Sequence, residues 1–595
     1  MNALLCIEFL IFKHRLMKTG FRLIIFLFAI FASTHSIGQY EWKWGRSVEG
    51  RVQAGMSEAW AIASDRFGHI YASGTTPRDT SIFGVDTFIN DIHFFYTFLV
   101  KYDMAGNVLW AKKYNTGLEG ITGMVADSSG NLYVVGSFNT CSMIIGTDTL
   151  RKPGCTGVHS DAINNFIAKF DSMGNPIWSK QLINGYYNPA IALDRSNNIY
   201  MTGSYGGVSA TIDTFVLVNR DILGRSYDAY VVKMDNDGHV LWVKTAGGRD
   251  FSHVGAAGHD MSNSIATDAG GNVYITGEFS SDYFAIDSFS IYNSYYRDYY
   301  NKIFIAKMDA TGRCLWVKSP TTVLTPLTMY FTGGETSTYI RVDNFGHFYI
   351  TGGFGGLRIK FDSIVLENTH EDADDVFLAK YDSSGNVIWA KRFGSDYQEV
   401  GYSILIDSLS QQVWSSGFVG SDSVVFGSFT ARGGTDVAYV MKCDTSGDVQ
   451  YLTTLPGGGE DWQQLATDGY GNIYMCGDFE DSSLVVNRDT LYGDAENYFI
   501  AKLGRSAMLP ELAAKHNAVA IELKLYPNPA KETITIKYDH SAAGALTITN
   551  MAGQIVHTQA FTGLSTISTA HYVPGIYMCR VVVDGRAMVS RFSVY

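Results

Sequence analysis

Aspartate and lysine are the side chains of this sequence that recur at regular spacing and could together hold or transfer a proton. Each repeated aspartate begins a turn-like motif, and a lysine follows 34 to 42 residues later. A catalytic centre occurs once in a chain, whereas these residues recur in every repeat. We therefore interpret them as structural, with Asp starting a turn and Lys making a repeated polar contact. The aspartates are Asp65, Asp127, Asp194, Asp268, Asp343, Asp407 and Asp468, and the lysines are Lys101, Lys169, Lys233, Lys307, Lys380, Lys442 and Lys502.

Carboxylates gather at two places where they could bind Ca²⁺. One is the loop at residues 371–375 (Glu-Asp-Ala-Asp-Asp), and the other is residues 235–238 (Asp-Asn-Asp-Gly). The first lacks the spacing of a known calcium loop, and the second has no glutamate where an EF-hand needs one. We predict solvated acidic loops and no cofactor, with Ca²⁺ as the alternative.

Residues 283–300 form an insertion rich in tyrosine. Tyrosine can contact sugars or protein partners at low entropic cost. The insertion is therefore a candidate ligand contact, and the alternative is an edge strand that packs on the strands of its own repeat. Its tyrosines are Tyr283, Tyr292, Tyr295, Tyr296, Tyr299 and Tyr300.

Other sequence features exclude several function classes. There is no HExxH and no GxSxG motif, so we predict no catalytic residues and a protein that is not an enzyme. The net charge of −13, without a basic stripe, argues against nucleic acid as a partner. The seven cysteines form no CxxC pair, but Cys141 and Cys155 lie in one insertion and could form a disulfide in an oxidising compartment.

Two motifs recur along the chain, and each indicates a β-hairpin. In the first, Asp-x-x-Gly separates two alternating apolar runs, because Asp favours the start of a turn and Gly supplies positive φ. The second reads aromatic, apolar, x, Lys, x, Asp, x, x, Gly, x, x, x, Trp. Two hairpins make four strands per repeat, the number in a propeller blade. The tryptophans are Trp110, Trp178, Trp242, Trp316 and Trp389, with Tyr451 in the sixth copy.

The ends of the repeat region indicate a closed ring. The seventh repeat stops at Gly504 without its Trp-bearing strand, and residues 40–44 (Tyr-Glu-Trp-Lys-Trp) read as that strand, with Trp42 as its tryptophan. Such a split repeat joins the two ends and leaves no open sheet edge. We predict an all-β fold: a seven-bladed β-propeller at residues 39–504, rather than a linear array, followed by a small β-sandwich. The repeats resemble the SBBP family of bacterial β-propeller repeats, most closely at residues 375–385, which implies the fold and almost nothing about function.

The N-terminus is typical of an exported protein. An apolar run at residues 23–32 follows Lys18 and Arg22 and precedes small residues, which indicates a signal peptide at residues 1–38. If translation starts at Met17, residues 1–16 are an upstream extension. The run is too short to span a bilayer, so we expect no transmembrane segment in the mature chain.

A linker at residues 505–523 leads to short strands at residues 524–595 whose spacing favours a β-sandwich. The Tyr-Pro-Asn-Pro opening at 526–529, the Gly-Gln turn at 553–554 and the Pro-Gly-Ile-Tyr strand at 574–577 are similar to the type A sorting domain of the type IX secretion system of Bacteroidetes-type bacteria. This resemblance implies that the type IX machinery exports the chain. The protein is then released or attached to the outer surface.

We therefore expect a secreted or cell-surface, non-enzymatic module that binds an extracellular polymer or protein. One alternative is a propeller enzyme that acts on extracellular polysaccharide as a hydrolase or lyase. Such an enzyme would need unique paired carboxylates, or His and Arg, at one mouth of the channel. The other alternative is a structural component of a surface layer.

Overall fold

The computed structural model describes residues 40–594 with interruptions, and all regular elements in the described residues are β-strands. The chain divides into two compact units, Met1–Ser506 and Ala507–Tyr595. The predicted signal peptide and most of the predicted linker lie outside the described residues. Within the described part, no helix has the length and apolar character needed to cross a membrane. The interruptions are residues 50–56, 78, 91–94, 118–119, 153–154, 156–158, 186–188, 250–257, 295–299, 324–334, 369, 371–372, 408–411, 433, 435–436, 460–462, 494–496, 507–522, 539–543, 551–554 and 584–585.

Seven antiparallel sets of four strands form the first unit in the described residues. The second and third sets join through a pairing of Gly185, in the last strand of the second set, with Tyr205, in the second strand of the third set. In the seventh set, the fourth strand comes from the opposite end of the unit. The sets are β2 (Glu58–Ser64), β3 (Ile70–Thr76), β6 (Tyr96–Tyr102) and β7 (Val108–Tyr114); β8 (Ile121–Ala126), β9 (Leu132–Thr140), β12 (His159–Phe170) and β13 (Pro176–Gly185); β14 (Ala190–Leu193), β15 (Ile199–Tyr205), β18 (Asp228–Met234) and β19 (Val240–Ala246); β20 (Asp260–Thr267), β21 (Val273–Phe279), β24 (Lys302–Met308) and β25 (Cys314–Lys318); β27 (Glu335–Val342), β28 (Phe348–Phe354), β31 (Asp375–Tyr381) and β32 (Val387–Phe393); β33 (Glu399–Ile406), β34 (Val413–Val419), β37 (Val437–Cys443) and β38 (Val449–Pro456); and β39 (Gln464–Thr467), β40 (Ile473–Phe479), β43 (Asn497–Arg505) and β1 (Tyr40–Ser47).

Each set also carries a short hairpin between its second and third strands, which was not predicted from the sequence. The hairpin is tied to the fourth strand of its own set. For example, Asp86 Oδ2 accepts the backbone N–H of Ala111 at 2.9 Å, and Asp148 Oδ2 accepts that of Ser179 at 3.0 Å. The hairpins are β4 (Thr80–Phe83) with β5 (Asp86–Ile89), β10 (Ser142–Ile145) with β11 (Asp148–Arg151), β16 (Ser209–Ile212) with β17 (Phe215–Val218), β22 (Tyr283–Ile286) with β23 (Phe289–Tyr292), β29 (Arg358–Phe361) with β30 (Ile364–Glu367) and the added β26 (Thr321–Val323), β35 (Ser423–Phe426) with β36 (Phe429–Arg432), and β41 (Ser483–Val486) with β42 (Asp489–Tyr492).

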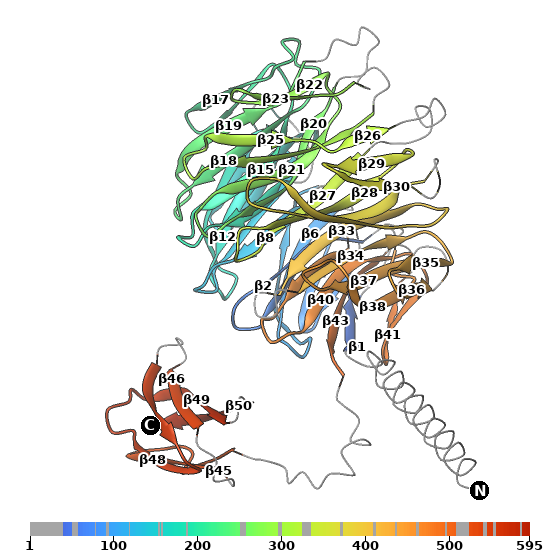
Figure 1. Cartoon of the computed structure of the whole chain (residues 1–595). Coiled ribbons are helices and arrows are strands. Elements are labelled where there is room, and N and C mark those ends of the chain that lie inside the picture. The colour runs from blue at the N-terminus through green and yellow to red at the C-terminus, as the bar shows by residue number, and fades with distance from the viewer. Residues whose placement is uncertain are drawn as a thin grey trace, which may run out of the picture. The chain divides into compact units, whose positions relative to one another are not determined.

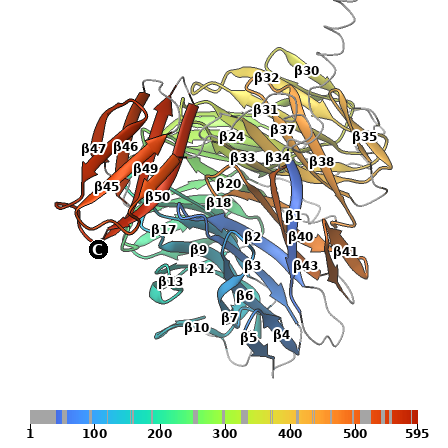
Figure 2. The same ribbon diagram turned by 90° about the horizontal axis from the view of Figure 1, so that it is seen from below.

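The first strands of the sets follow one another around a closed circuit. β2, β8, β14, β20, β27, β33 and β39 each contact the next in this order, and β39 contacts β2. The circuit is completed at the outer side of the seventh set, where β1 pairs antiparallel with β43. Figures 1 and 2 show β1, in blue, beside the orange strand β43, although the two are far apart in sequence. The second and third strands, in the interior of each sheet, contribute most of the buried side chains, and every residue of β3 and of β6 is buried.

A disulfide joins Cys141 to Cys155, with their Cα atoms 5.4 Å apart. The sequence left this pairing open. Cys141 lies directly before β10 and Cys155 lies after β11, so the bond closes the outer hairpin of the second set. Four other cysteines, Cys314, Cys443, Cys476 and Cys579, are buried and have no disulfide partner.

The second unit contains two antiparallel sheets in its described residues. One has the order β44 (Leu523–Tyr526), β45 (Thr533–Tyr538) and β48 (Leu564–Ser568), and the other β47 (Ile555–Phe561), β46 (Gly544–Asn550), β49 (Gly575–Val583) and β50 (Arg586–Val594). Apolar side chains of both sheets share one core, which includes Ile536 and Phe592. Asn528 connects the Pro-Asn-Pro segment to the last strand, because its Oδ1 accepts the Ser593 N–H at 3.0 Å.

Candidate functional site

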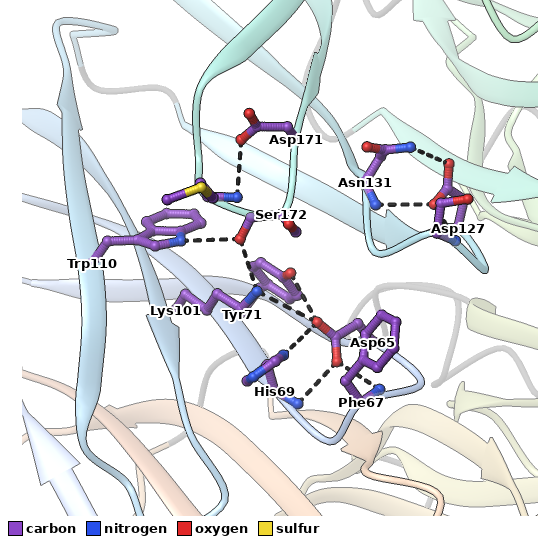
Figure 3. A network of polar contacts seen from close by, with 12 residues as sticks. Asp65, Phe67, His69, Tyr71, Lys101, Trp110, Asp127, Asn131, Asp171 and Ser172 are labelled. Atoms are coloured by element: carbon purple, nitrogen blue, oxygen red, sulfur yellow. Dashed lines mark hydrogen bonds and ion pairs between the residues drawn. The ribbon is translucent and has the colours of Figure 1, made fainter. Parts of the chain in front are cut away.

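The repeated aspartates lie in the turns of the first hairpins, and Asp65 shows the arrangement (Figure 3). Its Oδ1 accepts the backbone N–H groups of Phe67 and His69 at 2.9 and 3.0 Å. Its Oδ2 accepts the Tyr71 hydroxyl at 3.1 Å and lies 3.5 Å from the Lys101 ammonium. Burial would raise the pKa of Asp65, but hydrogen bonds from His69 and the charge of Lys101 hold it below its ordinary value. The same hydroxyl-to-carboxylate bond joins Tyr133 to Asp127, Tyr200 to Asp194, Tyr274 to Asp268 and Tyr474 to Asp468. The Asp343 carboxylate accepts the backbone N–H groups of Phe345 and His347. At Asp407, the backbone N–H donates to the Gln412 carbonyl.

The repeated lysines and tryptophans connect neighbouring sets. Lys101 Nζ and Trp110 Nε1 both donate to the Ser172 carbonyl oxygen, which belongs to a turn of the next set, at 2.9 and 3.4 Å (Figure 3). Gly174 in that turn has a φ of +79°, and a Cβ there would lie 2.9 Å from the Trp110 ring. Comparable bonds to a backbone carbonyl of the next set are donated by Lys233 and Trp242 to Ala310, by Lys169 to Asn236, by Lys307 to Ser383 and by Trp389 to Thr445. The rings of Trp178 and Trp316 pack on Tyr133 and Tyr274.

The seventh copy of this contact requires a correction, because Trp44, and not Trp42, occupies the repeated tryptophan position. Trp44 pairs with Lys502 as Trp110 pairs with Lys101, and its Nε1 donates to the Met104 carbonyl at 3.3 Å. Trp42 pairs with the following residue of β43, across an irregularity that falls between the two tryptophans. Counting residues from the sequence could not place this irregularity.

The tyrosine-rich segment is not a special insertion, because its start forms the short hairpin found in every set. Tyr283 pairs with Tyr292 across that hairpin, and Tyr292 is 73% exposed. Tyr300 is buried, and its hydroxyl donates to the Gly355 carbonyl at 3.0 Å, so the prediction that it contacts a ligand is wrong. Tyr295, Tyr296 and Tyr299 lie outside the described residues.

The two acidic segments likewise form no metal centre where they are described. Residues 235–238 are a hairpin turn in which Asp235 Oδ1 accepts the N–H groups of Asp237 and His239 at 2.9 and 2.8 Å. In the segment at residues 371–375, Glu371 and Asp372 lie outside the described residues, and Asp375 is ion-paired with Arg392 at 2.6 Å. Across the described residues, no three His, Cys, Asp or Glu side chains are grouped so that they could hold a metal ion.

A cavity of about 440 Å³ lies among the first strands and is the strongest candidate for a binding site. Small-molecule sites usually have volumes of about 300 to 1,000 Å³, with apolar walls and a few polar groups. Every set contributes to this cavity from its first strand. One lining residue from each set, in chain order, is Trp60, Thr122, Ile191, Asn263, Tyr339, Tyr402 and Gln464.

Irregular pairing of the first strands directs side chains into the cavity. In five of the first strands, one extra residue stands opposite the second strand at the same point of the repeat. Such bulges reorient a side chain and are common beside functional sites. All five extra residues line the cavity: Trp60, Thr122, Asn263, Thr338 and Tyr402. Three of them also bond the next set at or directly before its first strand, because Thr122 donates to Pro189 O, Asn263 to Ser337 O and Thr338 to Gly401 O.

The cavity is also the place where the repeat pattern breaks. Arg341 pairs with Tyr349, and the residues that pair with the corresponding aromatic residue in the other six sets are apolar. Tyr339 stands where the other sets have small residues or glutamine. The residues equivalent to Arg341 are Ala63, Val125, Ala192, Ala266, Leu405 and Ala466, and those equivalent to Tyr339 are Ala61, Gly123, Ala190, Ser264, Ser403 and Gln464.

Among the described residues that line the cavity, one is a carboxylic acid and one is a strong base, and the two differ in environment. Glu278 is 9% exposed, and burial raises its pKa to about 7, although a hydrogen bond of 3.0 Å from Asn301 acts in the opposite direction. Arg341 stacks on Tyr339, with its guanidinium carbon 4.4 Å from the ring centroid, and donates to the Tyr339 hydroxyl at 2.6 Å. Neither residue was predicted from the sequence, and for Arg341 the only signal would have been its departure from the repeat.

Residues 524–595 match the family described as a secretion system C-terminal sorting domain. The match identifies the second unit as a sorting domain and indicates that the chain is exported. It covers the end of the chain only.

The repeat region is similar to several known proteins. It is 23% identical over 440 residues to an uncharacterized WD repeat-containing protein of Acanthamoeba polyphaga mimivirus, an alignment that covers 65% of this chain and 31% of the relative. The chain therefore spans about a third of that relative's length. One similar solved structure is the WD40 domain of Toxoplasma gondii coronin, with a TM-score of 0.32 and 7% identity, in an alignment that covers 79% of this chain and 90% of that one. Another is a GH43_12 protein from a capybara gut metagenome, with a TM-score of 0.24 and 10% identity, in an alignment that covers 79% of this chain and 99% of that one.

Proposed function

We propose that this protein is an exported, non-enzymatic binding module whose ligand site is the cavity among the first strands. In this proposal, the seven four-stranded sets are the blades of a closed propeller, and the second unit is a β-sandwich that the type IX machinery recognises. The signal peptide at residues 1–38 is removed, and the mature protein is secreted or attached to the outer surface.

One observation carries the binding role: residues that break the repeat gather at a single cavity. The recurring Asp, Lys and Trp residues serve the repeat itself, because they form turns and connections between sets. Trp60, Tyr339, Arg341 and Tyr402 come from three different sets and line the same cavity. Aromatic residues and arginine are the side chains most often responsible for tight recognition. This concentration supports binding of an extracellular polymer, or of a protein segment, at the cavity.

The composition of the cavity wall favours binding over catalysis. Glu278 is the only carboxylate among the described residues that line it. Most glycoside hydrolases use two carboxyl groups that flank the bond to be broken. A propeller enzyme that acts on polysaccharide, as hydrolase or lyase, is therefore the second candidate, and a surface-layer component is the third.

A glycan and polysaccharide array tests the proposal with the full exported chain and its Trp60→Ala variant, in the presence and absence of Ca²⁺. We expect saturable binding by the parent protein, a loss of at least tenfold in the variant, and no released product. Product release would overturn the non-enzymatic role. If Trp60→Ala binds glycans as tightly as the parent protein, the binding site lies outside the cavity. Concentration-dependent assembly without glycan binding would favour the surface-layer role.

A further inference from the structure

The cavity contains a positive charge that no described acidic side chain balances. Arg341 forms no ion pair within the described residues, unlike the buried Lys101, which pairs with Asp65, and Arg392, which pairs with Asp375. It donates hydrogen bonds to the Tyr339 hydroxyl and to the Ile340 carbonyl. A guanidinium has five N–H donors, so Arg341 retains donors for another acceptor.

The position of Arg341 is fixed before any ligand arrives. Its guanidinium lies against the Tyr339 ring and is held by the Tyr339 hydroxyl. Both residues belong to β27, and both replace the smaller or apolar residues found at these positions in the other sets. A preordered arginine loses little entropy on binding, and its planar fork matches a carboxylate.

The remaining wall of the cavity suits a ring rather than a simple ion. Trp60 and Tyr402 contribute aromatic surfaces, and Asn263 and Thr338 add polar groups. Glu278 forms no ion pair with Arg341 within the described residues, and burial raises the pKa of Glu278 to about 7, so this carboxyl is only partly ionised at neutral pH. The chain as a whole has a net charge of −13, so attraction of an anion must be local.

We propose that the cavity binds an acidic sugar, such as a terminal uronic acid residue of a glycan, with the carboxylate on Arg341 and the sugar ring beside Trp60 and Tyr402. This inference rests on the proposed function, since it names the ligand class for the same cavity. A cavity of about 440 Å³ holds a chain end or a small oligosaccharide, and does not hold a long polymer.

Isothermal titration calorimetry of the full exported chain tests the inference with three probes: glucuronic acid, glucose and benzoate. We expect glucuronic acid to bind at least tenfold more tightly than either of the others. Arg341→Gln should lower its affinity at least tenfold, and Arg341→Lys should lower it less, because the charge remains without the fork. Arg313→Gln is the matched control, since Arg313 is exposed in a turn, ion-paired with Asp309 and outside the cavity lining. The Arg313→Gln variant should bind glucuronic acid as tightly as the parent protein does.

Three results would overturn the inference. If glucose binds as tightly as glucuronic acid, the ligand carboxylate does not contribute to binding. If benzoate binds as tightly, the sugar ring does not contribute. If a folded Arg341→Gln variant keeps its affinity for glucuronic acid, Arg341 is not the residue that binds the carboxylate. If none of the probes binds while array glycans still bind in a manner that Trp60→Ala abolishes, the acidic-sugar inference fails and the proposed function stands.

Discussion

The indole Nε1 of Trp44 donates a hydrogen bond of 3.3 Å to the carbonyl oxygen of Met104. Trp44 belongs to the strand that completes the seventh set, and Met104 belongs to a turn of the first set. Lys502 of β43 donates to the same carbonyl at 2.8 Å. The contact between the last and first sets is therefore the same as that between other neighbouring sets.

Trp44→Ala should destabilise the first unit by about 3 to 5 kcal/mol, as is typical when a buried aromatic side chain is removed. Trp44 is 8% exposed and packs on Tyr474 and Gly106. Trp42→Ala is the matched control, because Trp42 is less buried and its Nε1 bonds Thr454 of the sixth set. Chemical denaturation of both variants measures the difference. A larger loss for Trp42→Ala would contradict the assignment of Trp44 to the repeated position.

The sequence predicted the recurring residues well and the cavity poorly, and the reasons are physical. The turn formed by Asp65 recurs because each copy needs a side-chain acceptor for two backbone N–H groups, and this need leaves the same residue types in every repeat. The short hairpins were missed because their strands have four residues each and their turns contain different residues, such as Gly84, Asp213 and Asn487, all with positive φ. Their sequences therefore share no obvious motif.

The cavity residues could not be predicted because bulges change the alternation of the first strands. Residue alternation assigns one face of a strand to the core, but an extra residue reverses that assignment beyond the bulge. The extra residues at Trp60 and Tyr402 line the cavity for this reason. Only the pairing of each first strand with its neighbour reveals where the bulge falls.

Asp65→Asn should cost about 3 kcal/mol at neutral pH, because it leaves the buried Lys101 ammonium without its carboxylate partner. Since the pKa of Asp65 in the folded protein lies below its ordinary value of about 3.8, this stabilisation is present above that pH and is lost as the pH falls through the folded value. The difference between parent and variant should therefore narrow below about pH 4.

Asp103→Asn is the control for this prediction. Asp103 accepts the same turn bonds, from the Ala105 and Asn107 N–H groups, at a half-exposed position, and it forms no ion pair with a lysine among the described residues. Its replacement should cost about 1 kcal/mol. Urea denaturation at several pH values measures both variants, and equal losses at neutral pH would refute a special contribution of the Lys101 pair.

Replacing both Cys141 and Cys155 with serine should lower stability by about 2 to 3 kcal/mol, because the bond closes a loop with a sequence separation of 14. Reduction of the parent protein should have the same effect, and should leave the double variant unchanged. Hydrogen exchange should report the loss mainly in β10 and β11, which the bond encloses. A change spread evenly over all seven sets would contradict a local role.

Glu278→Gln should change the pH dependence of stability in a defined direction. In the folded protein the pKa of Glu278 is raised by burial to about 7, compared with about 4.5 in the unfolded chain. The folded state therefore holds a proton that the unfolded state releases, and the stability of the parent protein falls as the pH rises from about 4.5 to 7. A shift of this size corresponds to about 3 kcal/mol. Glutamine cannot ionise and can still accept the hydrogen bond from Asn301, so the variant should gain about 3 kcal/mol of unfolding free energy relative to the parent between pH 4.5 and pH 8.

Chemical denaturation of the parent and Glu278→Gln at these two pH values measures the gain. Asp228, Glu335 and Glu399 also have raised pKa values of about 7, but both proteins retain them, so their effect cancels in the difference. If the parent and variant differ by the same amount at both pH values, Glu278 is ionised in the cavity wall, and Arg341 then shares the cavity with a negative charge at neutral pH.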